Sequence, residues 1–270
     1  MKTRIIAAVA LLPLLLVVVL FAPKICTAIL FGAMAAIGAY ELTSGTGLVK
    51  EFRLNLYAMG MAFATCLWCG LGIGYGWLLL GILVFWALVF AEVMRGGMEI
   101  SFEKVAVCLA GGIILPLLFG SIVRIHSSSY GRYLVFVPFI LAFLSDTGAY
   151  FAGYFFGKHK LAPVISPKKT IEGVVGGVFT TILGMIIYCL VLQLAFDFAC
   201  NYVFAALYGL VGSLAAVFGD LCFSVIKRQT GIKDYGNLIP GHGGILDRFD
   251  SMMIVGPLAE ALLLLLPLVV

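Results

Sequence analysis

The feature that most constrains this sequence is the recurrence of apolar runs long enough to cross a lipid bilayer, which takes about 20 residues of α-helix. Hydrophobic residues make up 63% of the chain and charged residues 11%, too few to cover a soluble protein of this length. We therefore predict an all-α, polytopic integral membrane protein with about nine transmembrane helices. The runs span residues 5–22, 25–41, 55–70, 74–91, 105–123, 133–155, 173–196, 202–223 and 251–270.

Basic residues predict the orientation of these helices. With the N-terminus in the cytoplasm, all but Lys24, Arg124 and Arg132 of the 17 Lys and Arg residues lie on the cytoplasmic side, as the positive-inside rule requires. This pattern holds only if the runs at 55–70 and 74–91 are separate helices. The first run resembles a signal peptide but lacks a small-x-small cleavage site, so we expect a retained helix.

We expect one transmembrane domain over residues 1–270, with N-terminal helices to about 130 and the functional part from about 131 to 270. The expected location is the cell inner membrane or plasma membrane. The net charge of +4 is explained by the cytoplasmic loops, which attract anionic lipid headgroups. It indicates no nucleic-acid partner.

The densest polar block runs from residue 224 to 250 and holds three carboxylates, four cations, one histidine and five glycines. Asp220 lies just before it in an apolar run, where an acid must face a cavity or a partner. Asp247 and Asp250, three residues apart, would share one helix face. Carboxylates suit Mg²⁺, while cations and glycine-loop N–H groups suit phosphate. The alternative is a solvated loop whose opposite charges pair with each other.

A second polar cluster favours the functional interpretation. Asp146 lies inside the run at 133–155, and a basic loop with Lys168 and Lys169 follows it. Two helices separate that loop from the block at 224–250, so both loops lie on the same face in the predicted topology. Membrane acids and basic loops thus converge on one side, as a membrane-bound phosphate-transfer site needs.

At these residues the chain resembles the phosphatidate cytidylyltransferase, or CDP-diacylglycerol synthase, family. Residues 224–250 match the pattern S-x-Φ-K-R-x4-K-D-x-G-x2-Φ-P-x-H-G-G-Φ-x-D-R-Φ-D, where Φ is apolar. The segments S-D-x-x-A-Y at 145–150 and S-P-K-K-T-x-E-G at 166–173 are also similar to that family. The resemblance implies a multi-helix membrane enzyme that transfers CMP from CTP to phosphatidic acid, releasing pyrophosphate and forming CDP-diacylglycerol.

The resemblance also implies Mg²⁺, with room for a second cation, and leaves a homodimer open. It suggests Asp220 and Asp247 as the metal ligands. The histidine of the block could contact phosphate, shuttle a proton or only hydrogen-bond within a turn. The expected catalytic residues are Asp220, Asp247, Asp250, Lys227, Arg248 and His242. The expected substrate-binding residues are Ser224, Lys227, Arg228, Lys233, Asp234, Gly243, Gly244, Lys168, Lys169 and Asp146.

Two other functions compete with this interpretation. A CDP-alcohol phosphotransferase would also use membrane aspartates and Mg²⁺, but its D-x2-D-G-x2-A-R motif fails here because Ser251 follows Asp250. A secondary transporter could use the intramembrane acids as ion sites. That class predicts inverted repeats, and no clear internal repeat is present.

Overall fold

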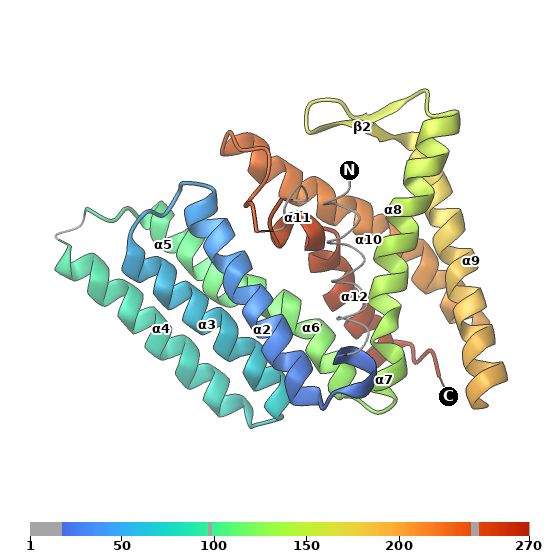
Figure 1. The fold of residues 1–270 in the computed structure, drawn as a ribbon, viewed down its shortest axis with the longest axis horizontal. Coiled ribbons are helices and arrows are strands. Elements are labelled where there is room, and N and C mark those ends of the chain that lie inside the picture. The colour runs from blue at the N-terminus through green and yellow to red at the C-terminus, as the bar shows by residue number, and fades with distance from the viewer. Residues whose placement is uncertain (1–17, 97–98, 239–242, 270) are drawn as a thin grey trace. The chain divides into compact units, whose positions relative to one another are not determined.

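The computed structural model describes residues 18–96, 99–238 and 243–269, and nearly all of its regular structure is helical (Figure 1). Within these residues, seven helical stretches are long and apolar enough to cross a membrane. The chain is therefore an all-α polytopic membrane protein, as predicted. The stretches are Lys24–Gly45, Phe52–Leu71, Tyr75–Arg95, Phe102–Ser127, Gly131–Phe156, Ile171–Phe196 and Tyr202–Gln229.

Two of the nine predicted runs are not among these seven stretches. The run at 251–270 forms the shorter apolar helix α12 (Met252–Leu265). The run at 5–22 lies mostly outside the described residues. The exact number of nine, the retained first helix and the cytoplasmic N-terminus stay predictions.

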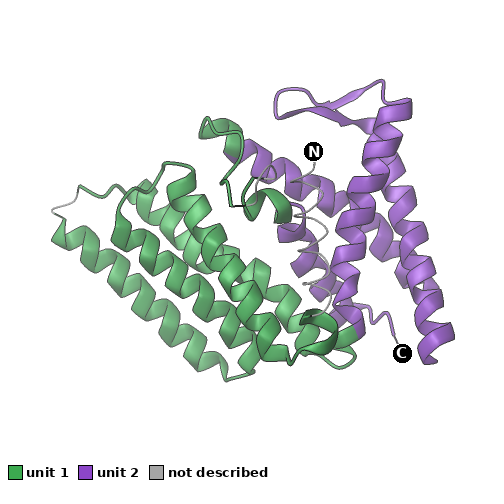
Figure 2. Cartoon of the chain, viewed as in Figure 1, with its two compact units in different colours: residues 1–132, 227–249 green, residues 133–226, 250–270 purple. Residues whose placement is uncertain are grey.

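The chain forms two compact units (Figure 2). Unit 1 comprises residues 1–132 and 227–249, and unit 2 comprises residues 133–226 and 250–270. Helices α7 (Gly131–Leu134) and α10 (Tyr202–Gln229) each continue across a unit boundary. The prediction of one domain with a functional C-terminal part stays a prediction.

Unit 1 holds most of the N-terminal helices. The runs at 55–70 and 74–91 are separate helices in it, as the charge distribution required. Helix α3 ends at Leu71, and Gly72 follows with a φ of 63°, a left-handed conformation that stops a helix. The elements that lie wholly in unit 1 are α2 (Lys24–Tyr40), the π-helical turn η1 (Glu41–Gly45), α3 (Phe52–Leu71), α4 (Tyr75–Arg95), α5 (Phe102–Leu109), η2 (Ala110–Ile114), α6 (Leu115–Ser127) and α11 (Leu246–Phe249).

Polar contacts between helix ends fix which ends of unit 1 lie together. Lys24 Nζ, at the start of α2, donates to the carbonyl oxygen of Ser127, at the end of α6, at 2.9 Å. Arg53 near the start of α3 pairs with Glu92 near the end of α4 at 3.1 Å. Both contacts join ends that the predicted topology places on the same side of the membrane.

Unit 2 is organised by the close approach of α8 (Phe136–Phe156) and α9 (Ile171–Phe196). A Cβ atom added to Gly173 or Gly177 of α9 would lie 2.8 or 2.9 Å from a backbone carbonyl oxygen of α8. Only glycine therefore permits this separation, an arrangement typical of membrane helix pairs. Helix α12 and most of α10 complete the unit.

A short antiparallel hairpin joins α8 to α9. It consists of β1 (Lys160–Ala162) and β2 (Ser166–Thr170), the two strands of the described residues. Thr170 ends β2 and caps α9, because its side-chain oxygen accepts a hydrogen bond from the Gly173 N–H at 3.2 Å. The hairpin thus places Lys168 and Lys169 directly before a membrane-length helix.

Candidate functional site

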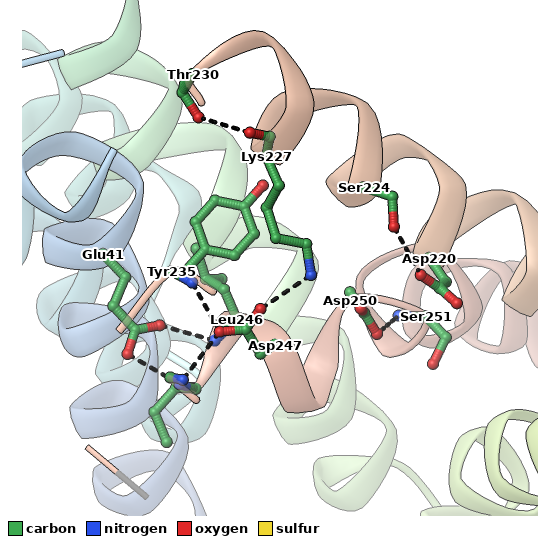
Figure 3. Close-up of polar contacts among 12 residues, drawn as sticks. Glu41, Asp220, Ser224, Lys227, Thr230, Tyr235, Leu246, Asp247, Asp250 and Ser251 are labelled. Carbon is green, nitrogen blue, oxygen red and sulfur yellow. Dashed lines mark hydrogen bonds and ion pairs between the residues drawn. The ribbon is translucent and has the colours of Figure 1, made fainter. Parts of the chain in front are cut away.

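In unit 1 the predicted site residues gather around Asp247, whose carboxylate is buried at the start of α11 (Figure 3). Its Oδ1 accepts a hydrogen bond from Lys227 Nζ at 2.9 Å. Its Oδ2 accepts from the backbone N–H of Tyr235 at 2.7 Å and of Gly244 at 2.9 Å. A buried charge needs such compensation by an ion partner and by donors. The Asp247 side chain is therefore held in a defined orientation.

The two glycines before α11 explain how the backbone reaches Asp247. Gly243 has a φ of 83°, and a Cβ atom there would lie 2.6 Å from Asp247 Oδ2. A side chain at this position would meet both backbone strain and a steric clash. Gly243 and Gly244 therefore let the loop pack closely against the Asp247 carboxylate, which accepts a hydrogen bond from the Gly244 N–H.

Lys227 has two further contacts that limit its movement. Its ammonium lies 5.5 Å from the centre of the Tyr235 ring, a cation–π distance. Its backbone carbonyl oxygen accepts a 3.4 Å hydrogen bond from the Thr230 hydroxyl. The lysine side chain is largely buried, so its charge is directed at Asp247 rather than at solvent.

Glu41 joins this group, although it was not among the residues predicted from the sequence. Its side chain is 4% exposed in η1, and its carboxylate accepts hydrogen bonds from the N–H groups of Ile245 at 2.9 Å and Leu246 at 2.8 Å (Figure 3). The available signal was an acid at the end of an apolar run, where a carboxylate needs a partner. We call Glu41, Lys227, Tyr235, Gly244 and Asp247 the Asp247 group.

In unit 2 a second group surrounds Asp220, on α10. Asp220 Oδ2 forms an ion pair with Lys169 Nζ of β2 at 2.6 Å. Asp220 Oδ1 accepts a 3.1 Å hydrogen bond from the Ser224 hydroxyl (Figure 3). Lys169 also donates to the carbonyl oxygen of Val217 at 3.3 Å. The basic hairpin is thereby attached to the turn of α10 that carries the acid.

Two more acids, Asp146 and Asp250, belong to this second group, which we call the Asp220 group together with Asp220, Lys169 and Ser224. Asp146 of α8 interacts electrostatically with Asp220, and its Oδ2 accepts a 3.4 Å hydrogen bond from the Ser251 hydroxyl. Asp250 Oδ1 accepts from the Ser251 N–H at 2.8 Å. A Cβ atom on Gly219 would lie 2.9 Å from the Asp250 carbonyl oxygen, so this backbone packs directly on α10. Acids from three segments thus gather within unit 2.

Several predicted cations are exposed rather than buried. Arg228 lies in the last turn of α10, Lys233 follows in the loop, and Arg248 lies on α11. Each has an exposed side chain, as does Lys168 on β2. Exposed cations in the chain segment that carries the buried Asp247, and on the hairpin, suit the binding of a polyanion from solution. Asp234 is also exposed, and His242 lies outside the described residues.

The donor set of these groups fits a hard divalent cation. Within the described part of the chain, no three His, Cys, Asp or Glu side chains are placed to hold a metal ion by themselves. Mg²⁺ is usually bound by only one or two carboxylates, with water and substrate phosphate completing the octahedron. Asp146 and Asp220 are two carboxylates of unit 2 whose like charges repel each other, a repulsion that a bound cation would relieve.

Comparison with known proteins agrees with this chemistry. The model of the cytidylyltransferase family matches residues 2–266. A phosphatidate cytidylyltransferase of Staphylococcus epidermidis is 41% identical over 184 residues, which cover 68% of each chain. Proteins of the same name from Staphylococcus aureus and Staphylococcus saprophyticus are 43% and 42% identical over 164 residues, 61% of each chain. The chain belongs to the cytidylyltransferase family.

Proposed function

We propose that this membrane protein is a phosphatidate cytidylyltransferase, which transfers CMP from CTP to phosphatidic acid and forms CDP-diacylglycerol and pyrophosphate. The family and the names of the relatives support this activity. The structural observation that carries it is the Asp247 carboxylate, buried against Lys227 under a glycine loop. It lies within a segment whose other cations are exposed.

The reaction needs positioning and charge compensation more than covalent chemistry. A phosphate oxygen of phosphatidic acid attacks the α-phosphorus of CTP, a new P–O bond forms, and the bond to the β-phosphate breaks as pyrophosphate leaves. Both reactants are anions, so they repel each other when they meet. No protein nucleophile is required, and catalysis rests on orientation and electrostatics.

The exposed cations hold the phosphate groups of the substrates in this proposal. Arg228, Lys233 and Arg248 act near Asp247, and Lys168 acts from the hairpin. Lys227 and Lys169 act in addition as ion partners that orient Asp247 and Asp220. Guanidinium groups suit two-point binding of phosphate, whereas ammonium groups act as point charges.

The carboxylates of Asp220 and Asp247 would hold Mg²⁺ in the proposal, with Asp146 and Asp250 as additional acids and room for a second cation. Bound Mg²⁺ would screen the repulsion between the substrates and stabilise the leaving pyrophosphate. The Ser224 hydroxyl orients Asp220, and the Gly243-Gly244 turn orients Asp247. Asp234 and His242 stay predicted contributors, and homodimerisation stays a prediction.

The proposal places the site on the cytoplasmic face. The excess of basic residues on that side of the predicted topology supports this location, and CTP is a solute of the cytoplasm. Labelling of single cysteines introduced at Lys233 and at Lys24, with a membrane-impermeant maleimide on intact cells, tests it. Protection at 233 with labelling at 24 agrees with the proposal, and the reverse pattern contradicts it.

The activity is tested with purified protein, CTP labelled at the α-phosphate, phosphatidic acid and Mg²⁺. We expect labelled CDP-diacylglycerol that requires phosphatidic acid and disappears with EDTA. Diacylglycerol in place of phosphatidic acid is the matched control, because it lacks the attacking phosphate. Failure of well-folded protein to form labelled lipid would contradict the proposal. A transporter would form none, and a CDP-alcohol phosphotransferase would instead consume CDP-diacylglycerol.

A further inference from the structure

The segment that carries Asp247 depends on a residue from a distant part of unit 1. Helix α11 has four residues, and a helix of one turn is not stable by itself. Its first N–H groups have no intrahelical acceptor and need partners from elsewhere. The Glu41 carboxylate accepts hydrogen bonds from the N–H of Leu246, the first residue of α11, and from the N–H of Ile245 just before it. Glu41 lies 204 and 205 residues away from them in the sequence.

Two carboxylates accept the hydrogen bonds of the backbone just before Asp247. Asp247 binds the N–H of Gly244, and Glu41 binds the next two N–H groups. Three consecutive peptide groups are therefore satisfied by acids, one from the segment itself and one from η1. The orientation of the Asp247 side chain follows from the backbone that Glu41 holds.

The space around Glu41 shows that this fit is close. A Cβ atom on Gly236 would lie 2.7 Å from Glu41 Oε1, and one on Gly244 would overlap the same carboxylate. A Cβ atom on Gly45, at the end of η1, would overlap the Tyr235 carbonyl oxygen. The loop thus contacts η1 at several backbone positions where no side chain intervenes.

Phe249 holds the other end of α11. Its ring packs against those of Phe31 on α2 and Phe119 on α6, with centroid separations of 6.4 and 5.6 Å. The polar contact with Glu41 and the aromatic contact therefore fix opposite ends of the same short helix. Loss of the aromatic contact would be a packing defect, whereas loss of Glu41 would free the N–H groups next to Asp247.

We propose that Glu41 is a positioning residue for the reaction, which holds residues 243–247 so that the Asp247–Lys227 pair keeps its productive geometry. This inference rests on the proposed function. Glu41 does not touch substrate in this account and acts through the backbone of Ile245 and Leu246. A displacement of about 1 Å in a catalytic group can lower a rate by about 100-fold, so the expected loss is in kcat.

The test compares Glu41→Gln and Glu41→Asp with Glu92→Gln as matched control. Gln keeps the volume of Glu but turns an NH2 donor toward an N–H donor, whereas Asp keeps the charge on a shorter side chain. Glu92 pairs with Arg53 in the same unit but away from α11. Measured are kcat and KM for CTP, the melting temperature, and hydrogen–deuterium exchange of a peptide covering residues 243–249.

For Glu41→Gln we expect a kcat about 10- to 100-fold lower, a KM for CTP within about threefold of wild type, and faster exchange in 243–249. Glu41→Asp should recover part of the kcat, and Glu92→Gln should match wild type. An unchanged kcat in Glu41→Gln, or unchanged exchange in that peptide, would overturn the inference. Should Glu41→Gln not fold, Glu41→Asp decides: slower turnover with faster local exchange supports the inference, and wild-type values overturn it.

Different results would refute the proposed activity and the positioning role of Glu41. Wild-type protein that forms no CDP-diacylglycerol would overturn the activity and the positioning role that rests on it, whatever the exchange data. Active wild-type protein with an indifferent Glu41→Gln variant would overturn the positioning role alone.

Discussion

Replacement of Lys227 by Met separates what the Asp247–Lys227 pair does for stability from what it does for catalysis. Met keeps most of the length and volume of the lysine side chain and removes its charge. Both side chains of the pair are largely buried, with 13% of Lys227 and 2% of Asp247 exposed. The variant therefore leaves a carboxylate in a site from which water is mostly excluded.

The structure sets the expected magnitude. Removing one partner of a buried ion pair destabilises a protein by about 3–5 kcal/mol. Asp247 would keep its two backbone donors, at 2.7 and 2.9 Å, so we expect a value near the lower end, about 3 kcal/mol. At about 2–4 °C per kcal/mol for a chain of this size, the melting temperature should fall by about 6–12 °C.

The double variant Lys227→Met/Asp247→Asn removes both charges at once. Residues in direct contact couple by about 0.5–3 kcal/mol, and a buried pair belongs at the upper end. The double variant should therefore be more stable than the two single effects added together, while it forms no CDP-diacylglycerol. Arg53→Met is the matched control, since its pair with Glu92 has an arginine that is 50% exposed and should contribute at most about 1 kcal/mol.

The assay is thermal unfolding in one detergent, followed in parallel with product formation from labelled CTP. Additive effects of the two single variants would show that Lys227 and Asp247 do not interact, which contradicts the described ion pair. Activity in the double variant would refute the catalytic role of the pair even if the stabilities behave as expected.

Three further outcomes are expected. Gly243→Ala should lower activity at least about 10-fold, since its Cβ would lie 2.6 Å from Asp247 Oδ2. Its control, Gly231→Ala, has a φ of 72° and nothing within 4 Å, so it should show only backbone strain of about 1–2 kcal/mol. Equal activities of the two variants would contradict the role of Gly243. Asp220→Asn should abolish Mg²⁺-dependent product formation in folded protein, and retained activity measured over a Mg²⁺ titration would remove it as a ligand. Lys168→Ala should raise the KM for CTP or phosphatidic acid by about 2- to 5-fold, as expected for one exposed charge contact, and an unchanged KM for both would refute its phosphate contact.

The sequence predicted the parts of the fold that depend on hydrophobic length and charge. Separate helices at 55–70 and 74–91 followed from the distribution of basic residues, and the left-handed Gly72 ends the first of them. The gathering of Asp146 and Asp220 was expected from the low probability that two intramembrane acids face lipid. Both inferences rest on the bilayer as solvent, which favours apolar side chains and penalises charged ones along the whole chain.

The sequence could not predict the partners of Asp247. The loop before α11 has five glycines and no hydrophobic period, so nothing local indicates that the Tyr235 and Gly244 N–H groups bind the same oxygen. Glu41 was missed because its partners are backbone N–H groups, which carry no residue-specific signal. The β1–β2 hairpin was also not predicted, since its short, lysine-rich strands lack the alternation typical of a buried strand.

In the proposed reaction the buried, lysine-paired Asp247 in its glycine loop is essential for CMP transfer to phosphatidic acid. Product formation by Asp247→Asn, at a protein concentration matched to wild type by a folding assay, tests it most directly. We expect labelled CDP-diacylglycerol from wild type and none above background from Asp247→Asn at any Mg²⁺ concentration. Substantial, Mg²⁺-dependent product from a folded Asp247→Asn variant would contradict it.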